Sequence, residues 1–218
     1  MFLTAIAACL ALQQQVESWT LTFKTDPKSP KESWATIVDA ESEGISHHAV
    51  FNLTRLTKSS APEKTTQTFR WERLSVDEKE GQEIDPWDVT VGKNGELLAM
   101  AGAVEDDYRR MLSPLVFVYP EKPVAPGDKW TMTPKPVANG RKFTYAYEVK
   151  SIELVEGAPA ILIGAKVTES GDQPIKGDGF WWLSRVGKVL KFEMKLENWI
   201  VPMAGSEVTN VIIRGKSL

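Results

Sequence analysis

The feature that most constrains this chain is a strict alternation of apolar and charged residues near its C-terminal end. Between positions 190 and 197, Leu190, Phe192, Met194 and Leu196 alternate with lysines and glutamates. A period of two places successive side chains on opposite faces of a strand. One face then packs in a core while the other meets water, as is typical of antiparallel sheets. This segment therefore predicts an amphipathic antiparallel strand.

Similar segments recur along most of the 218 residues. Asn94-Gly95 lies between two of them and is a strong hairpin signal, while Pro126-Gly127 predicts a type II turn. About a dozen short strands at this spacing predict a mainly β fold. We expect a single strongly curved antiparallel sheet, a half-barrel or open barrel, with a closed barrel or a sandwich as alternatives. Strands are expected at 16–25, 34–40, 45–56, 65–76, 87–91, 96–100, 128–133, 143–149, 161–167, 190–197 and 207–214.

One segment has the pattern of a helix instead. Val104, Tyr108, Met111 and Leu112 follow one another at helical spacing and form a single apolar stripe. Acidic residues occupy the first turn of this segment and arginines occupy its last turn, which suits the helix dipole. We expect one short amphipathic helix that ends at Pro114.

The N-terminal segment indicates where the protein works. Met1–Leu12 is an almost uncharged apolar run, and three glutamines follow it. This order is typical of the later part of a secretory signal, so residues 1–15 are predicted as a signal segment and 16–218 as a single β domain. Either Cys9 is lipidated within a lipobox or cleavage follows Ala11; a buried N-terminal strand or helix is the structural alternative. We expect an extracytoplasmic protein, periplasmic or secreted, with a membrane anchor if Cys9 is lipidated.

The charge distribution argues against a nucleic-acid partner, and the hydropathy argues against an internal transmembrane segment. The formal net charge is −3, from 26 basic and 29 acidic side chains, and the lysines are scattered through the predicted strands. A nucleic-acid-binding protein usually gathers a basic excess on one face, so no nucleic-acid partner is expected. No run of about 18 apolar residues follows the N-terminal segment, so no internal transmembrane segment is expected.

The residues that usually perform catalysis are scarce. The two histidines, His47 and His48, are adjacent in a predicted strand and point to opposite faces, so they cannot share a task. Cys9 is the only cysteine, so neither a disulfide nor a metal site built on cysteine and histidine is expected. No cofactor is expected. Asp106 and Asp107 fit the start of the helix, and a carboxylate-dependent hydrolase that uses them is a third alternative for the function.

Aromatic residues remain as candidate ligand contacts. The chain contains eight tryptophans, a residue that fits pleated surfaces and also lines apolar clefts. Trp181 and Trp182 are adjacent, so one of them faces away from the core and needs a cover. Packing within the core is the structural alternative for the whole set. The candidate ligand-binding residues are Trp71, Trp87, Tyr108, Trp181, Trp182 and Trp199.

Two functions fit these observations. The first is a non-catalytic binding protein, in which the curved sheet wraps an apolar cavity, the helix lies across its mouth, and the ligand is lipid-like or acylated. The second is a structural or interaction module of the cell envelope that binds a protein partner and no small molecule. A filled sheet interior and an exposed apolar patch would favour the second function.

Two stretches carry a family resemblance. The segment "YPEKPVAPGDKW" at 119–130 resembles a P-V-x-x-G-D-x-W element of poorly characterised bacterial secreted proteins and lipoproteins. The preceding "VTVGKNGELLAM" at 89–100 resembles the hairpin that leads to the helix in those proteins. The resemblance implies a curved-sheet fold, distantly similar to the lipoprotein-carrier proteins LolA and LolB. It implies no catalytic residues.

Overall fold

The structure, a computed structural model, describes residues 31–42, 45–61, 64–76, 79–80, 87–101, 105–134, 141–201 and 207–218. The signal segment, Cys9 and the strand predicted over 16–25 lie outside the described residues.

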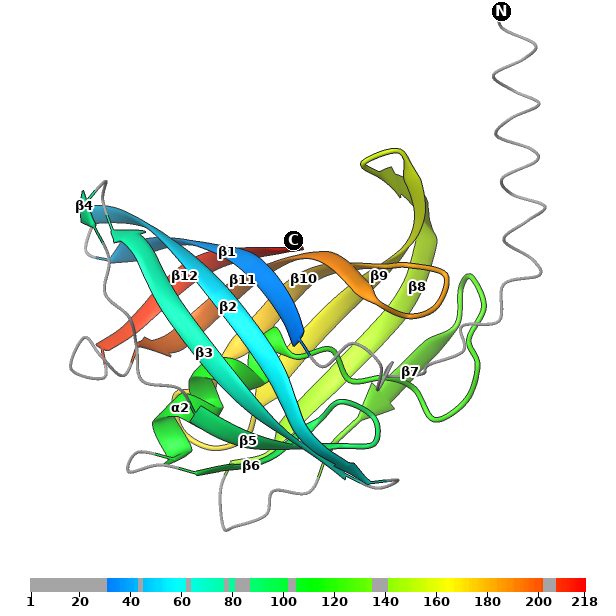
Figure 1. The fold of residues 1–218 in the computed structure, drawn as a ribbon, viewed down its shortest axis with the longest axis horizontal. Coiled ribbons are helices and arrows are strands. Elements are labelled where there is room, and N and C mark those ends of the chain that lie inside the picture. The colour runs from blue at the N-terminus through cyan, green and yellow to red at the C-terminus, as the bar shows by residue number, and fades with distance from the viewer. Residues whose placement is uncertain are drawn as a thin grey trace, which may run out of the picture.

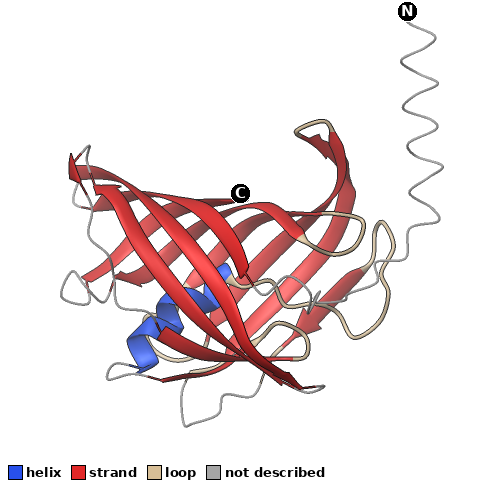
Figure 2. Cartoon of the chain, viewed as in Figure 1, coloured by secondary structure: helices blue, strands red, loops and turns tan. Residues whose placement is uncertain are grey.

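A single antiparallel sheet contains all the described strands (Figures 1 and 2). Their order is β6-β5-β3-β2-β1-β12-β11-β10-β9-β8-β7, and β4 pairs only with β3. The first and last long strands, β1 and β12, are therefore neighbours at the centre. The strands are β1 (Lys31–Ser42), β2 (Ile45–Ala61), β3 (Lys64–Val76), β4 (Lys79–Glu80), β5 (Trp87–Gly92), β6 (Leu97–Ala101), β7 (Lys129–Met132), β8 (Phe143–Val155), β9 (Ala158–Glu169), β10 (Lys176–Leu183), β11 (Val189–Val201) and β12 (Glu207–Ser217).

The sheet is strongly curved but does not close. β6 and β7 are the two ends of the strand order, and the described residues form no ladder between them. Figure 1 shows the sheet curling around α2 (Glu105–Leu112), the short helix. The prediction of one curved, open antiparallel sheet with one short helix is confirmed.

Local sequence signals set the turns of the sheet. Gly95, after Asn94, has a φ of +86° in the turn between β5 and β6. Gly127, after Pro126, has a φ of +88°, and the amide of Asp128 donates a hydrogen bond of 3.0 Å to the carbonyl of Ala125. Both turns lie where the sequence predicts them. The connection between the strands predicted at 45–56 and 65–76 is shorter than expected, because β2 continues to Ala61 and β3 begins at Lys64.

The helix continues into a segment that we call the inner strap, residues 105–119. It consists of α2, the 3-10 turn η1 (Ser113–Leu115) and the extended residues that follow. Pro114 lies within η1, two residues after the helix ends at Leu112, and its missing amide proton costs nothing at the start of such a turn.

The inner strap crosses the interior of the curved sheet. Its helix contacts β6 and β11. At its other end the amide of Tyr119 donates 2.7 Å to the carbonyl of Asn94, beside β6. The indole Nε1 of Trp130, on β7, donates 3.3 Å to the carbonyl of Val118. The strap therefore lies between the two edge strands and bridges the gap that the sheet leaves open.

Candidate functional site

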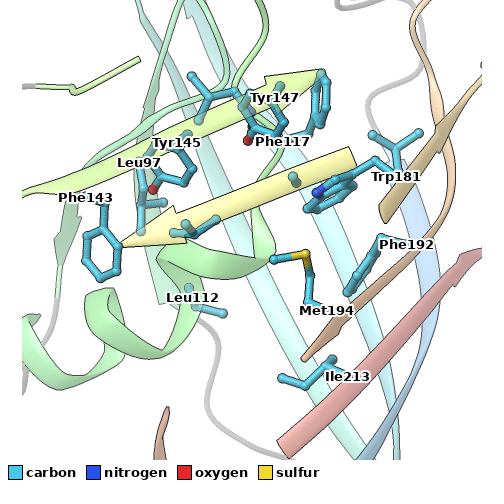
Figure 3. Packing of buried hydrophobic residues seen from close by; sticks show 14 of the residues in the cluster. Leu97, Leu112, Phe117, Phe143, Tyr145, Tyr147, Trp181, Phe192, Met194 and Ile213 are labelled. Carbon is cyan, nitrogen blue, oxygen red and sulfur yellow. Dashed lines mark hydrogen bonds between the residues drawn. The ribbon is translucent and has the colours of Figure 1, made fainter. Parts of the chain in front are cut away.

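The inner face of the sheet is packed with aromatic rings around the inner strap (Figure 3). The ring of Phe117 lies 4.9 Å from those of Tyr119 and Tyr147, 5.5 Å from that of Trp181 and 6.2 Å from that of Trp130, centroid to centroid. Tilted and edge-on contacts of this kind add to the free energy of apolar burial. The side chain of Phe117 thus occupies the position on the inner face that a ligand would need.

Two buried tyrosines hold the backbone of the strap. The hydroxyl of Tyr147 accepts a hydrogen bond of 3.1 Å from the amide of Val118, and the hydroxyl of Tyr145 donates one of 3.2 Å to the carbonyl of Ser113. Burial raises the pKa of both phenols above their ordinary value, because a phenolate would lose its hydration. Both are therefore neutral hydrogen-bonding groups at physiological pH.

Two of the predicted ligand-binding tryptophans belong to this core. Trp181 stacks on Phe192 with centroids 4.8 Å apart. Trp199 is buried under the helix, and its indole Nε1 donates 2.9 Å to the carbonyl of Met111. Asn198 directly before it has a φ of +56°, within an irregularity where β11 shifts its register. This bulge explains why Leu196 and Trp199, three positions apart, are both buried.

Trp182 lies on the opposite, outer face of the sheet. Its indole Nε1 donates 2.9 Å to a carboxylate oxygen of Glu153, and the ammonium of Lys191 lies 4.5 Å from its ring centroid. Phe180 is a tilted neighbour at 6.1 Å on the same strand. The outward side chain of Trp182 is therefore contacted by Glu153 and Lys191 rather than by a second layer of secondary structure.

The remaining predicted ligand contacts are dispersed. Tyr108 is half-buried on α2 and packs against the core. Trp71 lies on β3 opposite Leu53, and Trp87 begins β5 opposite Phe69, but their side chains lie outside the described residues. The described members of the set do not converge on one site, because Trp181 lies opposite Phe192, seven positions before Trp199 on β11, and Trp182 faces the outer side.

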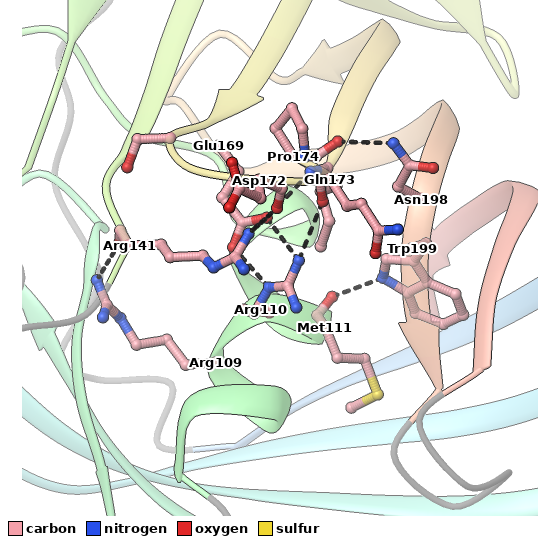
Figure 4. Close-up of polar contacts among 12 residues, drawn as sticks. Arg109, Arg110, Met111, Arg141, Glu169, Asp172, Gln173, Pro174, Asn198 and Trp199 are labelled. Atoms are coloured by element: carbon pink, nitrogen blue, oxygen red, sulfur yellow. Dashed lines mark hydrogen bonds and ion pairs between the residues drawn. The ribbon is translucent and has the colours of Figure 1, made fainter.

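A buried ion pair that the sequence reading missed fastens the helix to the sheet (Figure 4). The side chain of Glu169, at the end of β9, is 0% exposed. Arg110 grips it in a bidentate pair, with Nε at 2.6 Å from Oε1 and Nη2 at 2.8 Å from Oε2. Oε2 also accepts 3.0 Å from the amide of Ile175, and Arg141 lies 3.6 Å away. Both carboxylate oxygens therefore accept hydrogen bonds, three in all.

The same side chains hold the loop between β9 and β10. Three consecutive carbonyls in this loop accept hydrogen bonds from side chains, at Asp172 from Arg141, at Gln173 from Arg110 and at Pro174 from Asn198. The sequence contains one signal for this arrangement, because Glu169 is in phase with the alternate apolar residues of its strand and so falls on the inner face. We interpret the cluster as a structural fastening, since its carboxylate has no exposed surface.

The outer face carries a ladder of alternating charges instead. Glu193, Arg214, Asp39 and His48 lie on four neighbouring strands, β11, β12, β1 and β2. Arg214 pairs with Glu193 at 3.0 Å and with Asp39 at 2.5 Å, and Asp39 contacts His48 at 2.7 Å. The hydrogen bond to Glu193 and the two nearby carboxylates raise the pKa of Arg214. These side chains remain partly exposed, so the ladder resembles a solvated strand surface rather than a reactive site.

The three most exposed of the large apolar side chains in the described residues lie at one end of the sheet. We call this end the rim; it comprises the turns 154–159 and 184–188 and the chain end at Leu218. Leu154, Val186 and Leu218 are 63%, 69% and 73% exposed. Ile161 pairs with Leu183, so both turns project beyond the same point of the sheet, and Lys191 pairs with Lys216, which places Leu218 at the same end. The rim is where the described surface departs most from an ordinary polar one.

Two features are absent from the part of the chain that the structure describes. No group of three or more histidine, cysteine or acidic side chains there is arranged to hold a metal ion. No described helix is both long enough and apolar enough to span a membrane.

Comparisons with known proteins found two similar folds. No protein-family model matches the chain, and no curated protein sequence matches it. A solved structure from Bacteroides fragilis NCTC 9343, described as an exported protein with a YmcC-like fold, has a TM-score of 0.38 at 11% identity, covering 91% of this chain and 97% of that one. The hypothetical lipoprotein YmcC from Escherichia coli (K12) has a TM-score of 0.38 at 13% identity, with 87% of each chain covered. Both scores are too low to carry an argument about function, and the P-V-x-x-G-D-x-W element and the LolA/LolB likeness stay predictions.

Proposed function

We propose that the protein is an extracytoplasmic, non-catalytic binding module that engages its partner through the rim. The observation that carries this proposal is the filled inner face, where the inner strap packs among the aromatic rings of β7 to β11. An interaction module is thus a better fit to the geometry than a carrier with its ligand inside the sheet.

The hydrogen bonds of the strap support this choice. A ligand that entered between the strap and β8 would have to break the bonds that Tyr145 and Tyr147 make to Ser113 and Val118. It would also separate the hydroxyl of Tyr119 from the carbonyl of Gly187, 3.0 Å away. Leaving a buried polar group unpaired costs about 1–3 kcal/mol. Several such costs would cancel much of the free energy gained by burying an apolar ligand.

The compartment and the absence of catalysis are proposed from the sequence. The apolar run Met1–Leu12 and the lipobox pattern Ile6–Cys9 favour export. Adjacent histidines that face opposite sides of a strand, and a cysteine inside the export signal, leave few groups for nucleophilic or acid–base chemistry.

A second candidate function keeps an apolar or acylated ligand, bound elsewhere in the sheet. Trp34 on β1 and Phe51 on β2 pack against the core cluster but are only half-buried. Apolar side chains of this kind are suited to contact a lipid-like chain. This candidate function requires that protein purified from its own host contains a bound apolar molecule.

Native mass spectrometry of protein purified from the envelope of its own host separates the two candidates. The rim proposal expects the mass of the polypeptide with its own modifications and no other molecule. A stoichiometric apolar ligand would contradict it in favour of the carrier. The mass of the mature N-terminus also decides between lipidation of Cys9 and cleavage after Ala11.

A photo-reactive residue tests the rim directly. Placed at Val186 it should cross-link to envelope lipid or protein in living cells, whereas the same residue at Lys195, an exposed position in the middle of β11, should not. Equal cross-linking at both positions, or none at Val186, would refute an interaction through the rim.

A further inference from the structure

Building on the proposed function, we propose that the rim docks onto an anionic phospholipid bilayer. The turn 184–188, between β10 and β11, is the main contact, and we call it the basic tip. Arg185, Val186 and Lys188 are its exposed side chains.

The backbone of the basic tip is held by hydrogen bonds, which fix the directions in which its side chains leave the turn. The amide of Ser184 donates 2.7 Å to the carbonyl of Lys188, and the amide of Gly187 donates 2.9 Å back to the carbonyl of Ser184. Gly187 has a φ of +82°, which favours glycine, and its carbonyl is held by the hydroxyl of Tyr119. A turn fastened on both sides loses little conformational freedom when it binds.

The charge of this segment suits an anionic surface. From Leu183 to Lys191 the chain contains three basic residues and no acidic one. In the other turn of the rim the acid Glu156 pairs with Lys216, so the excess positive charge of the rim lies at the basic tip. Each basic side chain close to an anionic leaflet raises the binding constant by about fivefold. A surface that attracts the basic tip would therefore orient the whole molecule with this turn toward it.

The exposed apolar side chains of the rim fit a bilayer better than a protein. Val186, Leu154 and Leu218 project from two separate turns and from the chain end. Isolated apolar side chains beside basic ones can enter the boundary between headgroups and acyl chains without a matching surface. A protein interface usually needs a continuous, well-packed apolar centre. The described rim residues do not form one.

The first residues of β1 lie at the same end of the molecule as the rim. The amide of Leu218 donates 3.0 Å to the carbonyl of Ser33, so β1 begins beside the chain end at the rim. A lipid on Cys9 would be joined to Lys31 by residues 10–30, which reach at most about 80 Å. An anchored chain would therefore keep the rim close to the membrane and raise its effective concentration there.

Vesicle co-sedimentation tests the proposal. The full-length chain is produced without export, so that Cys9 carries no lipid, and is mixed with vesicles of phosphatidylcholine alone or with phosphatidylglycerol added. We expect binding that requires phosphatidylglycerol and weakens as salt rises. Arg185→Glu with Lys188→Glu should reduce it at least about 25-fold. Val186→Asp should reduce it about tenfold, because an apolar contact is lost.

A matched double variant controls for net charge. Lys166→Glu with Lys195→Glu changes the charge by the same amount on exposed positions within β9 and β11, and should leave vesicle binding unchanged. Circular dichroism confirms that each variant is folded. Equal losses of vesicle binding in the two double variants would overturn the proposal. Binding to vesicles of phosphatidylcholine alone that salt does not weaken would also overturn it, because such binding indicates insertion of the N-terminal apolar run.

The result also separates this inference from the function on which it rests. If the protein does not bind the vesicles but a photo-reactive residue at Val186 still cross-links to an envelope protein, the bilayer is the wrong partner while the rim remains the interface. If native mass spectrometry finds an apolar ligand, the rim function itself is wrong.

Discussion

Replacing Glu169 by glutamine removes a negative charge from a side chain that water does not reach. Its two carboxylate oxygens accept 2.6 and 2.8 Å hydrogen bonds from Arg110 and a third of 3.0 Å from the amide of Ile175. The glutamine amide has one donor group in place of an acceptor, so at least one of these contacts becomes a clash of donors. The guanidinium of Arg110, itself only 13% exposed, then loses its counter-charge.

The expected cost follows from this burial. Breaking a buried ion pair by removing one partner destabilises a protein by about 3–5 kcal/mol, because the other charge stays buried. The remaining exposure of Arg110 lets water recover a little of its solvation, so we expect a loss near the lower bound, about 3 kcal/mol. With a typical urea slope of about 2 kcal/mol per molar, the unfolding midpoint should fall by about 1.5 M.

The outer face offers a matched control. Glu193 pairs with Arg214 at 3.0 Å, but the two side chains are 41% and 40% exposed. Glu193→Gln should therefore cost below about 1 kcal/mol, as exposed pairs do. Urea unfolding followed by tryptophan fluorescence measures both variants. If Glu169→Gln costs no more than Glu193→Gln, the buried pair does not fasten the helix to the sheet.

Four further perturbations test other parts of the fold. Tyr147→Phe leaves the amide of Val118 unpaired and should lower the free energy of unfolding by about 1–3 kcal/mol in urea titrations. The raised pKa values of Tyr145 and Tyr147 mean that the stability they contribute is complete below about pH 10 and is lost as the pH rises further, which urea titrations at alkaline pH should reveal. Glu156→Asn should raise the thermal midpoint by a few degrees, because Glu156 has a φ of +52° that asparagine tolerates better. Gly179→Ala should destabilise by about 1–3 kcal/mol, since its Cβ would lie 2.1 Å from a backbone oxygen of the next strand.

Each of these has an outcome that contradicts its reasoning. Tyr147→Phe with an unchanged midpoint would mean that Val118 finds another partner. Equal alkaline losses in the wild type and in a variant with both tyrosines replaced by phenylalanine would exclude the phenols as the cause. Glu156→Asn without gain would show that the turn is not strained, and a neutral Gly179→Ala would show that β11 can move away.

The alternation of apolar and polar residues predicted most of the sheet, because that period depends only on one buried and one wet face. It failed to predict the path of the inner strap, since residues 115–119 are apolar without a period and could equally have formed a strand. The pairing of β1 with β12 at the centre of the sheet is also absent from the sequence pattern, because these strands are far apart in the chain and the alternation within a strand does not specify its partner.

The candidate site was harder to predict than the fold. Aromatic abundance indicated a cavity, yet Trp181 and Trp199 are explained by the core that the strap completes. The position of Trp199 depends on the bulge at Asn198, which reverses the phase of its strand and leaves no mark in composition. Glu169 was visible as a charge in phase with an apolar face, and that departure is the sign that identifies a buried ion pair.

The distribution of these contacts suggests why a partner should meet the rim. The inner strap is fastened at its helix by Arg110 and Glu169, at its middle by Tyr145 and Tyr147, and at its end by Tyr119. Releasing it would cost about 5 kcal/mol or more from the buried pair and the hydrogen bonds together, which approaches the whole stability of many domains. Opening the interior would therefore amount to partial unfolding, whereas binding at the rim requires no change in the fold.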